Sequence, residues 1–206
     1  MPRPRVHELD RILDAAESLA VSSGPTAATI RAISAAVGVS NGALYHSFGS
    51  RKGLLARVWL RAGQRFLDAQ IAAVEQAASG VEAVLAAADT PAAFAEAHRN
   101  SCLLLLTVPR DKLLAPDLPH EIATEVSDLE RTLVSLLIRL AFDMWDRKDA
   151  AAVDTITMCI VDLPTAILLS RNRLRSRKAR EQLRAAVRAV LDAGPPESAP
   201  PERARP

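Results

Sequence analysis

The sequence predicts an all-α fold, and three observations indicate it. Apolar side chains recur every three or four residues along most of the 206-residue chain, which is the period of an amphipathic helix. Eight glycines beside many Ala and Leu residues favour helices over a turn-rich β-sandwich. No segment alternates apolar and polar residues in the manner of a half-buried strand. The 49% share of hydrophobic residues is ample for a packed core and excludes a wholly disordered chain.

The first quarter of the chain predicts three helices, of which the second and third are short, and then a longer one. The first covers about 6–23, and Gly24-Pro25 ends it. Thr29 is a typical N-cap for a second helix, whose Ile30 and Ile33 face inward. A third helix covers about 40–48 and a fourth about 51–78, separated by a break at Gly49-Ser50.

The remaining sequence also has the helical period. Thr90-Pro91 predicts a helix start, because Thr can cap a helix and Pro suits its first position. Residues 108–119 hold three prolines and predict a loop. Further helices are expected over about 119–148, 150–171 and 177–193, with a kink at Pro164. Residues 194–206 hold five prolines and predict a disordered tail.

Charge is divided unevenly along a chain whose net charge is only +2. Residues 1–65 carry nine basic and four acidic side chains, whereas residues 66–170 carry seven and sixteen. A basic head on an acidic body suggests that the head binds a polyanion, although such an excess is also common on ordinary surfaces. Residues 171–180, RNRLRSRKAR, are interpreted as a solvated loop and helix start, with a second nucleic-acid contact as the alternative.

Residues 29–48, TIRAISAAVGVSNGALYHSF, have the pattern of a helix–turn–helix. Gly38 permits the positive φ of a tight turn, and the small residues Gly42 and Ala43 let the second helix approach DNA closely. Leu44 and Phe48 are expected to be core residues that support this helix. The spacing alone fits an ordinary helical hairpin equally well.

The stretch from Arg11 to Leu55 resembles the N-terminal domain of TetR-type transcriptional regulators. The matching pieces are ILDAA at 12–16, Gly24, the T-I-R-x-I pattern at 29–33 and the run VGVSNGALYHSFGSRKGLL at 37–55. The resemblance implies a helix–turn–helix DNA-binding domain over 1–50, a helical ligand-binding and dimerisation domain over 51–193, and a tail over 194–206. Ser47 departs from the family, which often has an aromatic residue or His there.

The resemblance also implies roles for individual residues. Thr29 matches the family's cap of the second helix, which holds a phosphate; Tyr45 and His46 match residues that contact the DNA backbone. Asn41 has the side chain to bind adenine, but a cap or a phosphate contact is an equal alternative. The DNA-binding candidates are Thr29, Ser40, Asn41, Gly42, Ala43, Tyr45, His46, Arg51 and Lys52.

The larger domain offers candidates for an effector site, although each of them could simply be a core residue. His98 and Cys102 lie one turn apart, but two ligands without a third make weak evidence, so we expect neither a metal nor a cofactor. The candidates are Trp59, Phe66, Phe94, His98, Cys102, Phe142, Met144 and Trp145.

The family implies a homodimer in which the last two helices pair with those of a second copy. The dimer-interface candidates are Ile156, Ile160, Ile167, Leu183, Val187 and Val190. We therefore expect a homodimeric repressor that binds a pseudo-palindromic double-stranded DNA operator and is released by a small, apolar effector. An all-helical carrier or enzyme without DNA binding is the alternative, but no nucleophile-and-base or phosphate-cradling motif indicates an enzyme.

The cysteine content and the apolar runs of the sequence predict its compartment and whether it associates with a membrane. Two cysteines, Cys102 and Cys159, make no disulfide framework and suit a reducing compartment. The N-terminus has no apolar signal core, and the longest Leu-rich run, 103–106, is too short to cross a bilayer. We therefore expect a cytoplasmic protein without a membrane partner.

Overall fold

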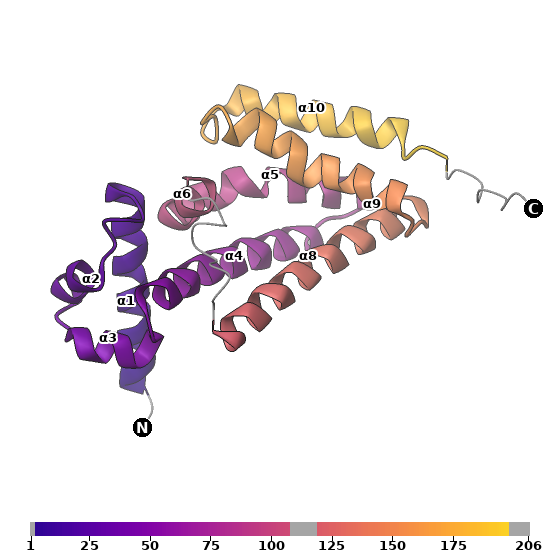
Figure 1. Cartoon of the computed structure of the whole chain (residues 1–206). Helices are drawn as coiled ribbons and strands as arrows, with labels where there is room; N and C mark the ends of the chain where they lie inside the picture. The colour runs from indigo at the N-terminus through magenta and orange to yellow at the C-terminus, as the bar shows by residue number, and fades with distance from the viewer. Residues whose placement is uncertain (1–2, 108–118, 198–206) are drawn as a thin grey trace, which may run out of the picture. The chain divides into compact units, whose positions relative to one another are not determined.

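The computed structural model describes residues 3–107 and 119–197, and within these ranges all regular structure is helical (Figure 1). The expected all-α fold class is confirmed. The helices, in chain order, are α1 (Arg3–Ser23), α2 (Ile30–Val37), α3 (Asn41–Phe48), α4 (Arg51–Glu75), α5 (Gly80–Ala97), α6 (Arg99–Thr107), α8 (His120–Trp145), α9 (Ala150–Thr157), η1 (Met158–Asp162), η2 (Thr165–Leu169) and α10 (Arg177–Ala193).

The chain forms two compact units. The first contains 1–67 and 94–130, and the second contains 68–93 and 131–206. None of the three boundaries between the units coincides with the expected division after residue 50, because the first turns of α4 share the core of α1 to α3. That division by function stays a prediction, while the last helix ends at Ala193, as expected.

The helix–turn–helix part of the first unit is built around a shared apolar core. Ile12, Ile33, Leu44 and Leu54 come from four successive helices and are all buried in it. Leu104 of α6 belongs to the same core and has no exposed surface. Helices α1 to α3 therefore depend on side chains from α4 and α6 for their burial, since a core this small is marginal by itself.

In the second unit, the expected helix over 150–171 is a run of α-helical and π-helical turns. The Leu163 N–H donates to Met158 O, and the Ser170 N–H donates to Thr165 O, so both bonds span five residues. Pro164 lies between these wide turns, where its missing N–H leaves the helix locally loosened. Helix α10 packs along η1 and η2, and Figure 1 shows it beside them.

The expected helix start at Thr90-Pro91 is wrong, because α5 begins at Gly80 and contains Pro91 in its interior. Ser79 provides the cap instead, accepting from the Glu82 N–H at 3.3 Å. A proline inside a helix deprives the carbonyl four residues earlier of its donor. Here that carbonyl is Ala87 O, and the side-chain amide of Gln70, only 1% exposed, donates to it at 3.0 Å.

The other expected helices agree with the structure to within a few residues. Helix α1 already begins at Arg3, and α4 ends at Glu75 rather than near residue 78. Most of the expected loop over 108–119, and the last nine residues of the tail, lie outside the described residues.

The run from Ala150 to Leu169 is the one helix within the described residues that is long and apolar enough to cross a membrane, by length and composition alone. The candidate membrane-spanning segment is therefore this run and not the Leu-rich run at 103–106. Such a helix also fits a buried or interface position in a water-soluble protein.

We expect Gln70→Leu to lower the free energy of unfolding by about 1–3 kcal/mol, because Ala87 O would then be buried without a donor. The substitution Pro91→Ala restores a backbone N–H to that carbonyl. In a double-mutant cycle followed by urea unfolding, Gln70→Leu should cost clearly less in the Pro91→Ala background. Equal costs in both backgrounds would show that the two residues are not coupled.

Candidate nucleic-acid interface

The segment over 29–49 is a helix–turn–helix whose ends are capped by its own side chains. Thr29 Oγ1 accepts from the Ala32 N–H at 3.1 Å, and Ser40 Oγ accepts from the Ala43 N–H at 3.2 Å. Gly38 ends α2 at φ 72°, a left-handed conformation that favours glycine. The turn therefore fixes where α3 begins, and the caps and glycine turn expected from the sequence are confirmed.

Helix α3 has one buried face and one exposed face. Leu44 has no exposed surface, and Phe48 packs half-buried against the same core. Both supporting roles expected from the sequence are confirmed. Tyr45, in contrast, is 53% exposed. The exposed residues of the helix and its cap are Ser40, Asn41, Gly42, Ala43, Tyr45, His46 and Ser47.

Small residues leave the backbone of α3 open to a ligand. An added Cβ at Gly42 would meet nothing nearer than Ser40 Oγ at 3.9 Å, so this position points into open space. The opposite holds at Gly53, where an added Cβ would lie 2.4 Å from Phe48 O. Gly53 is thus required for the close approach of α4 to the end of α3, whereas Gly42 has no such packing requirement.

The backbone N–H and the side-chain hydroxyl of Thr29 differ in whether they can still bind a ligand. Its backbone N–H donates to Ala27 O at 2.7 Å, so that group is already used within the loop. Its hydroxyl oxygen accepts from Ala32, which leaves the hydroxyl proton able to donate outward from an exposed side chain. Only the hydroxyl is then suited to hold a phosphate as the family resemblance implies.

Arg51 differs from the other eight DNA-binding candidates because it is half-buried. Its Nε donates to Ala28 O at 2.9 Å, and its Nη2 donates to Pro25 O. The guanidinium thus ties the first turn of α4 to the loop before α2. Lys52, the next residue, is exposed. A DNA contact by Arg51 stays a prediction, and the structure adds a supporting role that spacing could not indicate.

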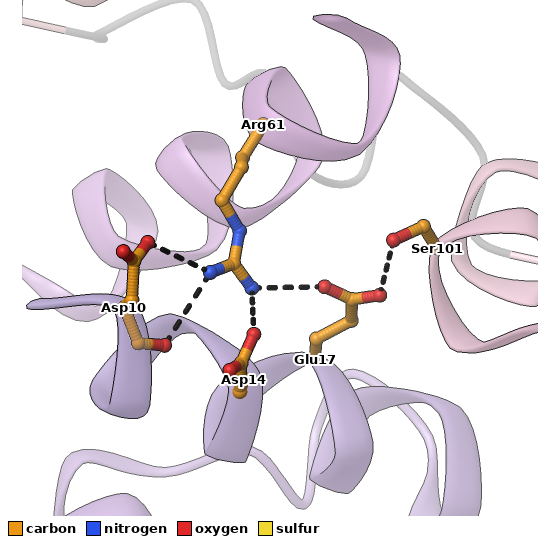
Figure 2. A network of polar contacts seen from close by, with 5 residues as sticks. All are labelled: Asp10, Asp14, Glu17, Arg61 and Ser101. Atoms are coloured by element: carbon orange, nitrogen blue, oxygen red, sulfur yellow. Dashed lines mark hydrogen bonds and ion pairs between the residues drawn. The ribbon is translucent and has the colours of Figure 1, made fainter. Parts of the chain in front are cut away.

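A polar network, not expected from the sequence, connects α1, α4 and α6 (Figure 2). Arg61 Nη2 donates to Asp14 at 2.7 Å and to Glu17 at 3.0 Å, and Nη1 lies 3.4 Å from Asp10. The Ser101 hydroxyl donates to the other oxygen of Glu17 at 2.6 Å. The signal in the sequence was the spacing of the three acidic residues, which lie four and three residues apart on one helical face.

Glu17 is the decisive member of this network because its side chain is only 5% exposed. A buried carboxylate requires both a counter-charge and hydrogen bonds. Arg61 supplies the counter-charge and one hydrogen bond, and the Ser101 hydroxyl donates a second hydrogen bond. The network therefore holds α6 against the helix that supports the helix–turn–helix.

Comparison with known proteins agrees with this geometry. Residues 12–58 match the family model described as bacterial regulatory proteins of the tetR family. The N-terminal part of the chain is a TetR-family DNA-binding domain. No curated protein matches the sequence.

Solved structures of TetR regulators share the fold over most of the chain. A TetR-like transcriptional regulator from Rhodococcus sp. RHA1 is 20% identical with a TM-score of 0.67, over 92% of this chain and 98% of the other. The TetR family regulator PfmR from Thermus thermophilus is 23% identical with a TM-score of 0.62, over 89% and 98%. The fatty acid degradation regulator FadR from Bacillus halodurans is 16% identical with a TM-score of 0.64, over 88% and 97%.

A domain of this family identifies a DNA-binding transcriptional regulator, and the family is not one of enzymes. The alternative of a helical carrier or enzyme without DNA binding is thereby set aside. The helix–turn–helix of the regulator is the part matched by the family model, and it lies wholly in the first unit.

The structure brings three of the eight effector-site candidates together. The Phe66 and Phe94 rings meet edge to face with centroids 5.4 Å apart, and the His98 ring lies 5.0 Å from Phe94. Phe94, His98 and Cys102 do not share one helix, because α5 ends at Ala97 and α6 begins at Arg99. Trp59 packs half-buried against the core of the first unit.

The other three effector-site candidates lie at the end of α8, in the second unit. Phe142 is exposed beneath Lys148, whose Nζ lies 4.5 Å from the ring centroid. An added Cβ on Gly80 would lie 3.1 Å from the Met144 sulfur, and one on Gly194 would lie 3.9 Å from the Trp145 indole nitrogen. These contacts suit packing at the helix end, and an effector role for the three stays a prediction.

Neither cysteine is available as a thiolate. Burial raises the pKa of Cys102 to about 11, and it does the same for Cys159. A buried, protonated thiol is a poor metal ligand. Across 3–107 and 119–197, no three His, Cys, Asp or Glu side chains gather into a metal site.

The dimer-interface candidates lie mostly inside the monomer. Ile167 and Val190 are half-buried. The side chains buried within the second unit are Ile156, Ile160, Leu183 and Val187. Because these four side chains are buried within the monomer, they can only support the surface residues of an interface and cannot contact a second copy directly. On the outer face of the same run, Met158 is 44% exposed and Val161 is 37% exposed.

Arg51→Lys keeps the positive charge but loses the paired N–H groups that bond the two loop carbonyls. We expect it to lower the free energy of unfolding by about 1–3 kcal/mol, the scale of hydrogen bonds to a charged group. The salt dependence of DNA binding should change by much less than about one unit of slope, because the charge remains. Urea unfolding and binding titrations at several salt concentrations measure the two effects.

Lys52→Gln is the matched control, since it removes a charge at an exposed neighbouring site. It should reduce the salt slope by about one unit, which Arg51→Lys should not. Full stability of Arg51→Lys would show that the carbonyl contacts contribute nothing.

Proposed function

We propose that this TetR-family regulator is a homodimeric repressor in which two copies of α3 bind the half-sites of a pseudo-palindromic operator. The observation that carries the proposal is that α3 has one buried and one exposed face. Leu44 anchors the helix in the core, while its small and polar residues are exposed. A major groove accepts a helix of this kind, and a two-fold protein requires a two-fold site.

The exposed side chains have distinct roles in the proposed complex. Tyr45, His46 and the Thr29 hydroxyl donate to phosphates, while Ser40 and Asn41 lie at the positive end of α3. Asn41 is the side chain best suited to contact an adenine edge. Gly42 and Ala43 bring the backbone close to the bases.

Release of the operator follows from an effector that displaces α6 or α4. The packing of Leu104 in the core of the helix–turn–helix domain supports this coupling, as does the Ser101–Glu17–Arg61 network. Phe66, Phe94 and His98 form the aromatic wall proposed for the effector. One of the similar structures is a fatty acid degradation regulator, so fatty acyl compounds are the first effectors to test.

Dimerisation uses the outer face of the run Ala150–Leu169 in this proposal. Met158 and Val161 are exposed there on a helix whose composition is strongly apolar. A second copy of the same helix buries this surface in a parallel or antiparallel pair, as in a helical bundle. The proposed protein is cytoplasmic, and the apolar face is covered by protein and not by lipid.

Selection of bound sequences from random duplex DNA tests the DNA-binding function. We expect an enriched pseudo-palindrome, because two identical heads impose the symmetry of the site. Thr29→Ala and Tyr45→Ala should each weaken binding to that sequence by about 1.5–3 kcal/mol, the scale of a hydrogen bond to a charged group. Enrichment of no sequence at low salt would contradict the proposal.

Gly42→Leu separates the DNA contact from folding. The side chain enters open space, so the protein should fold with unchanged or slightly higher stability, since Leu favours a helix over Gly. Binding to the selected operator should be lost by steric exclusion. Ser18→Ala, an exposed change on α1, is the control that should leave binding intact.

The dimer interface is tested by placing one charge on each of two exposed valines of the second unit. Val161→Glu should convert the dimer into a monomer at micromolar concentration, because an unpaired carboxylate would be buried in the interface. Val134→Glu, at a side chain 49% exposed on α8, should leave the dimer intact. Sedimentation velocity distinguishes the two, and a monomer from Val134→Glu alone would assign the interface to α8.

A further inference from the structure

The turn between η2 and α10 carries a dense group of positive charges. Its exposed cations, which we call the basic turn, are Arg171, Arg173, Arg175, Arg177 and Lys178. The segment 171–178 contains no acidic residue. Arg177 is 94% exposed and pairs with Glu181, itself 67% exposed, so screening makes that pair weak.

The other arginines of α10 have partners, which makes the basic turn distinctive. Arg180 binds Asp89 with two hydrogen bonds of 2.9 and 2.5 Å. Arg184 and Arg188 both bond Glu82, at 2.6 and 3.0 Å. Among the residues that the structure describes, none forms a hydrogen bond or ion pair with the side chains of the remaining four cations, Arg171, Arg173, Arg175 and Lys178.

The turn has a defined backbone, so its cations are held near one another. Leu174 is buried at 7% exposure. The Arg173 N–H donates to Leu168 O at 2.7 Å, and the Ser176 N–H donates to Arg173 O at 2.8 Å. The Ser176 side chain in turn caps α10 by accepting from the Ala179 N–H at 3.2 Å. The burial of Leu174 and these backbone hydrogen bonds therefore hold the turn in place despite the repulsion among its cations.

The chemistry of the basic turn fits phosphate groups along a polyanion. Guanidinium groups bind phosphate with two parallel hydrogen bonds and are weakly hydrated. The only apolar side chain of the segment, Leu174, is buried, so the turn offers no anchor to a lipid bilayer or an amphipathic peptide. Several exposed cations within eight residues can contact more than one phosphate, and a polyanion offers many.

We infer that the basic turn is a second DNA-binding site, which contacts the phosphate backbone without regard to sequence. The choice of DNA among polyanions rests on the proposed function. The head selects the operator, and the basic turn adds contacts to any duplex within reach. The role left open for residues 171–180 is thereby assigned to non-specific DNA affinity.

The experiment uses the full chain and a duplex of random sequence. The head variant Thr29→Ala/Tyr45→Ala serves as the background, so that the remaining affinity reports contacts outside α3. Into this background we introduce either Arg171→Gln/Arg173→Gln/Arg175→Gln or a control with the same charge change, Arg99→Gln/Arg131→Gln/Arg139→Gln, at exposed positions elsewhere. Fluorescence anisotropy at several salt concentrations gives the affinity and its salt slope, and circular dichroism checks folding.

We expect the basic-turn variant to reduce the salt slope by about three units, since each lost phosphate contact removes about 0.9. The control should change it far less. Equal slopes for the two triple variants would overturn the inference, because only net charge would then matter. Charge-dependent binding to vesicles of phosphatidylserine and phosphatidylcholine, without duplex binding, would also overturn it by assigning the turn to a lipid surface.

The two proposals fail in different ways. If the protein with an unmodified head enriches an operator but the head variant binds no random duplex, the inference fails and the repressor function stands. If no operator is enriched while random duplex binds through the basic turn, the repressor function fails and the second site stands.

Discussion

Complete burial of Leu44 is the constraint on which the DNA-binding surface depends. Helix α3 has eight residues and few bulky side chains, so it is too short to be stable in isolation. Leu44 has no exposed surface and meets a core contributed by α1, α2, α4 and α6. Loss of such a side chain costs about 2–5 kcal/mol, which is a large part of a small domain's stability. Apart from Phe48, which packs half-buried against the same core, the other residues of α3 are exposed and mostly small or polar.

Two arginines make this arrangement rigid by satisfying groups that burial would otherwise leave without partners. Arg51 bonds loop carbonyls next to α2, and Arg61 compensates the buried Glu17. Neither role uses arginine for an exposed surface pair, which would contribute little. The same residue type points outward in the basic turn, where Arg177 alone has a carboxylate partner among the described residues, the exposed Glu181. The regulator therefore separates its cations into those that hold the fold and those that can meet phosphate.

Local signals in the sequence predicted the helix–turn–helix because its determinants are local. A cap residue, a positive-φ glycine and the inward spacing of Ile33 and Leu44 each act within a few residues. Prediction failed at Pro91 because its local preference for a first helical turn is overridden by a contact distant in sequence. Gln70 supplies the missing donor from another helix, and nothing within ten residues of Pro91 indicates it.

The sequence by itself determined the helical class, the family and which face of α3 is exposed, because period, capping and a short ordered motif encode these features. Only the tertiary structure decided which polar side chains already have partners. In the structure, Arg51 donates to loop carbonyls, Arg180 pairs with Asp89, and Glu17 pairs with Arg61. Arg173 and Arg175 are exposed, and neither pairs with a carboxylate of the described residues. The tertiary structure also buried Ile160 and exposed Met158. The physical reason is that a side chain's partners come from whichever helices pack beside it, and helical periodicity says nothing about which helices those are.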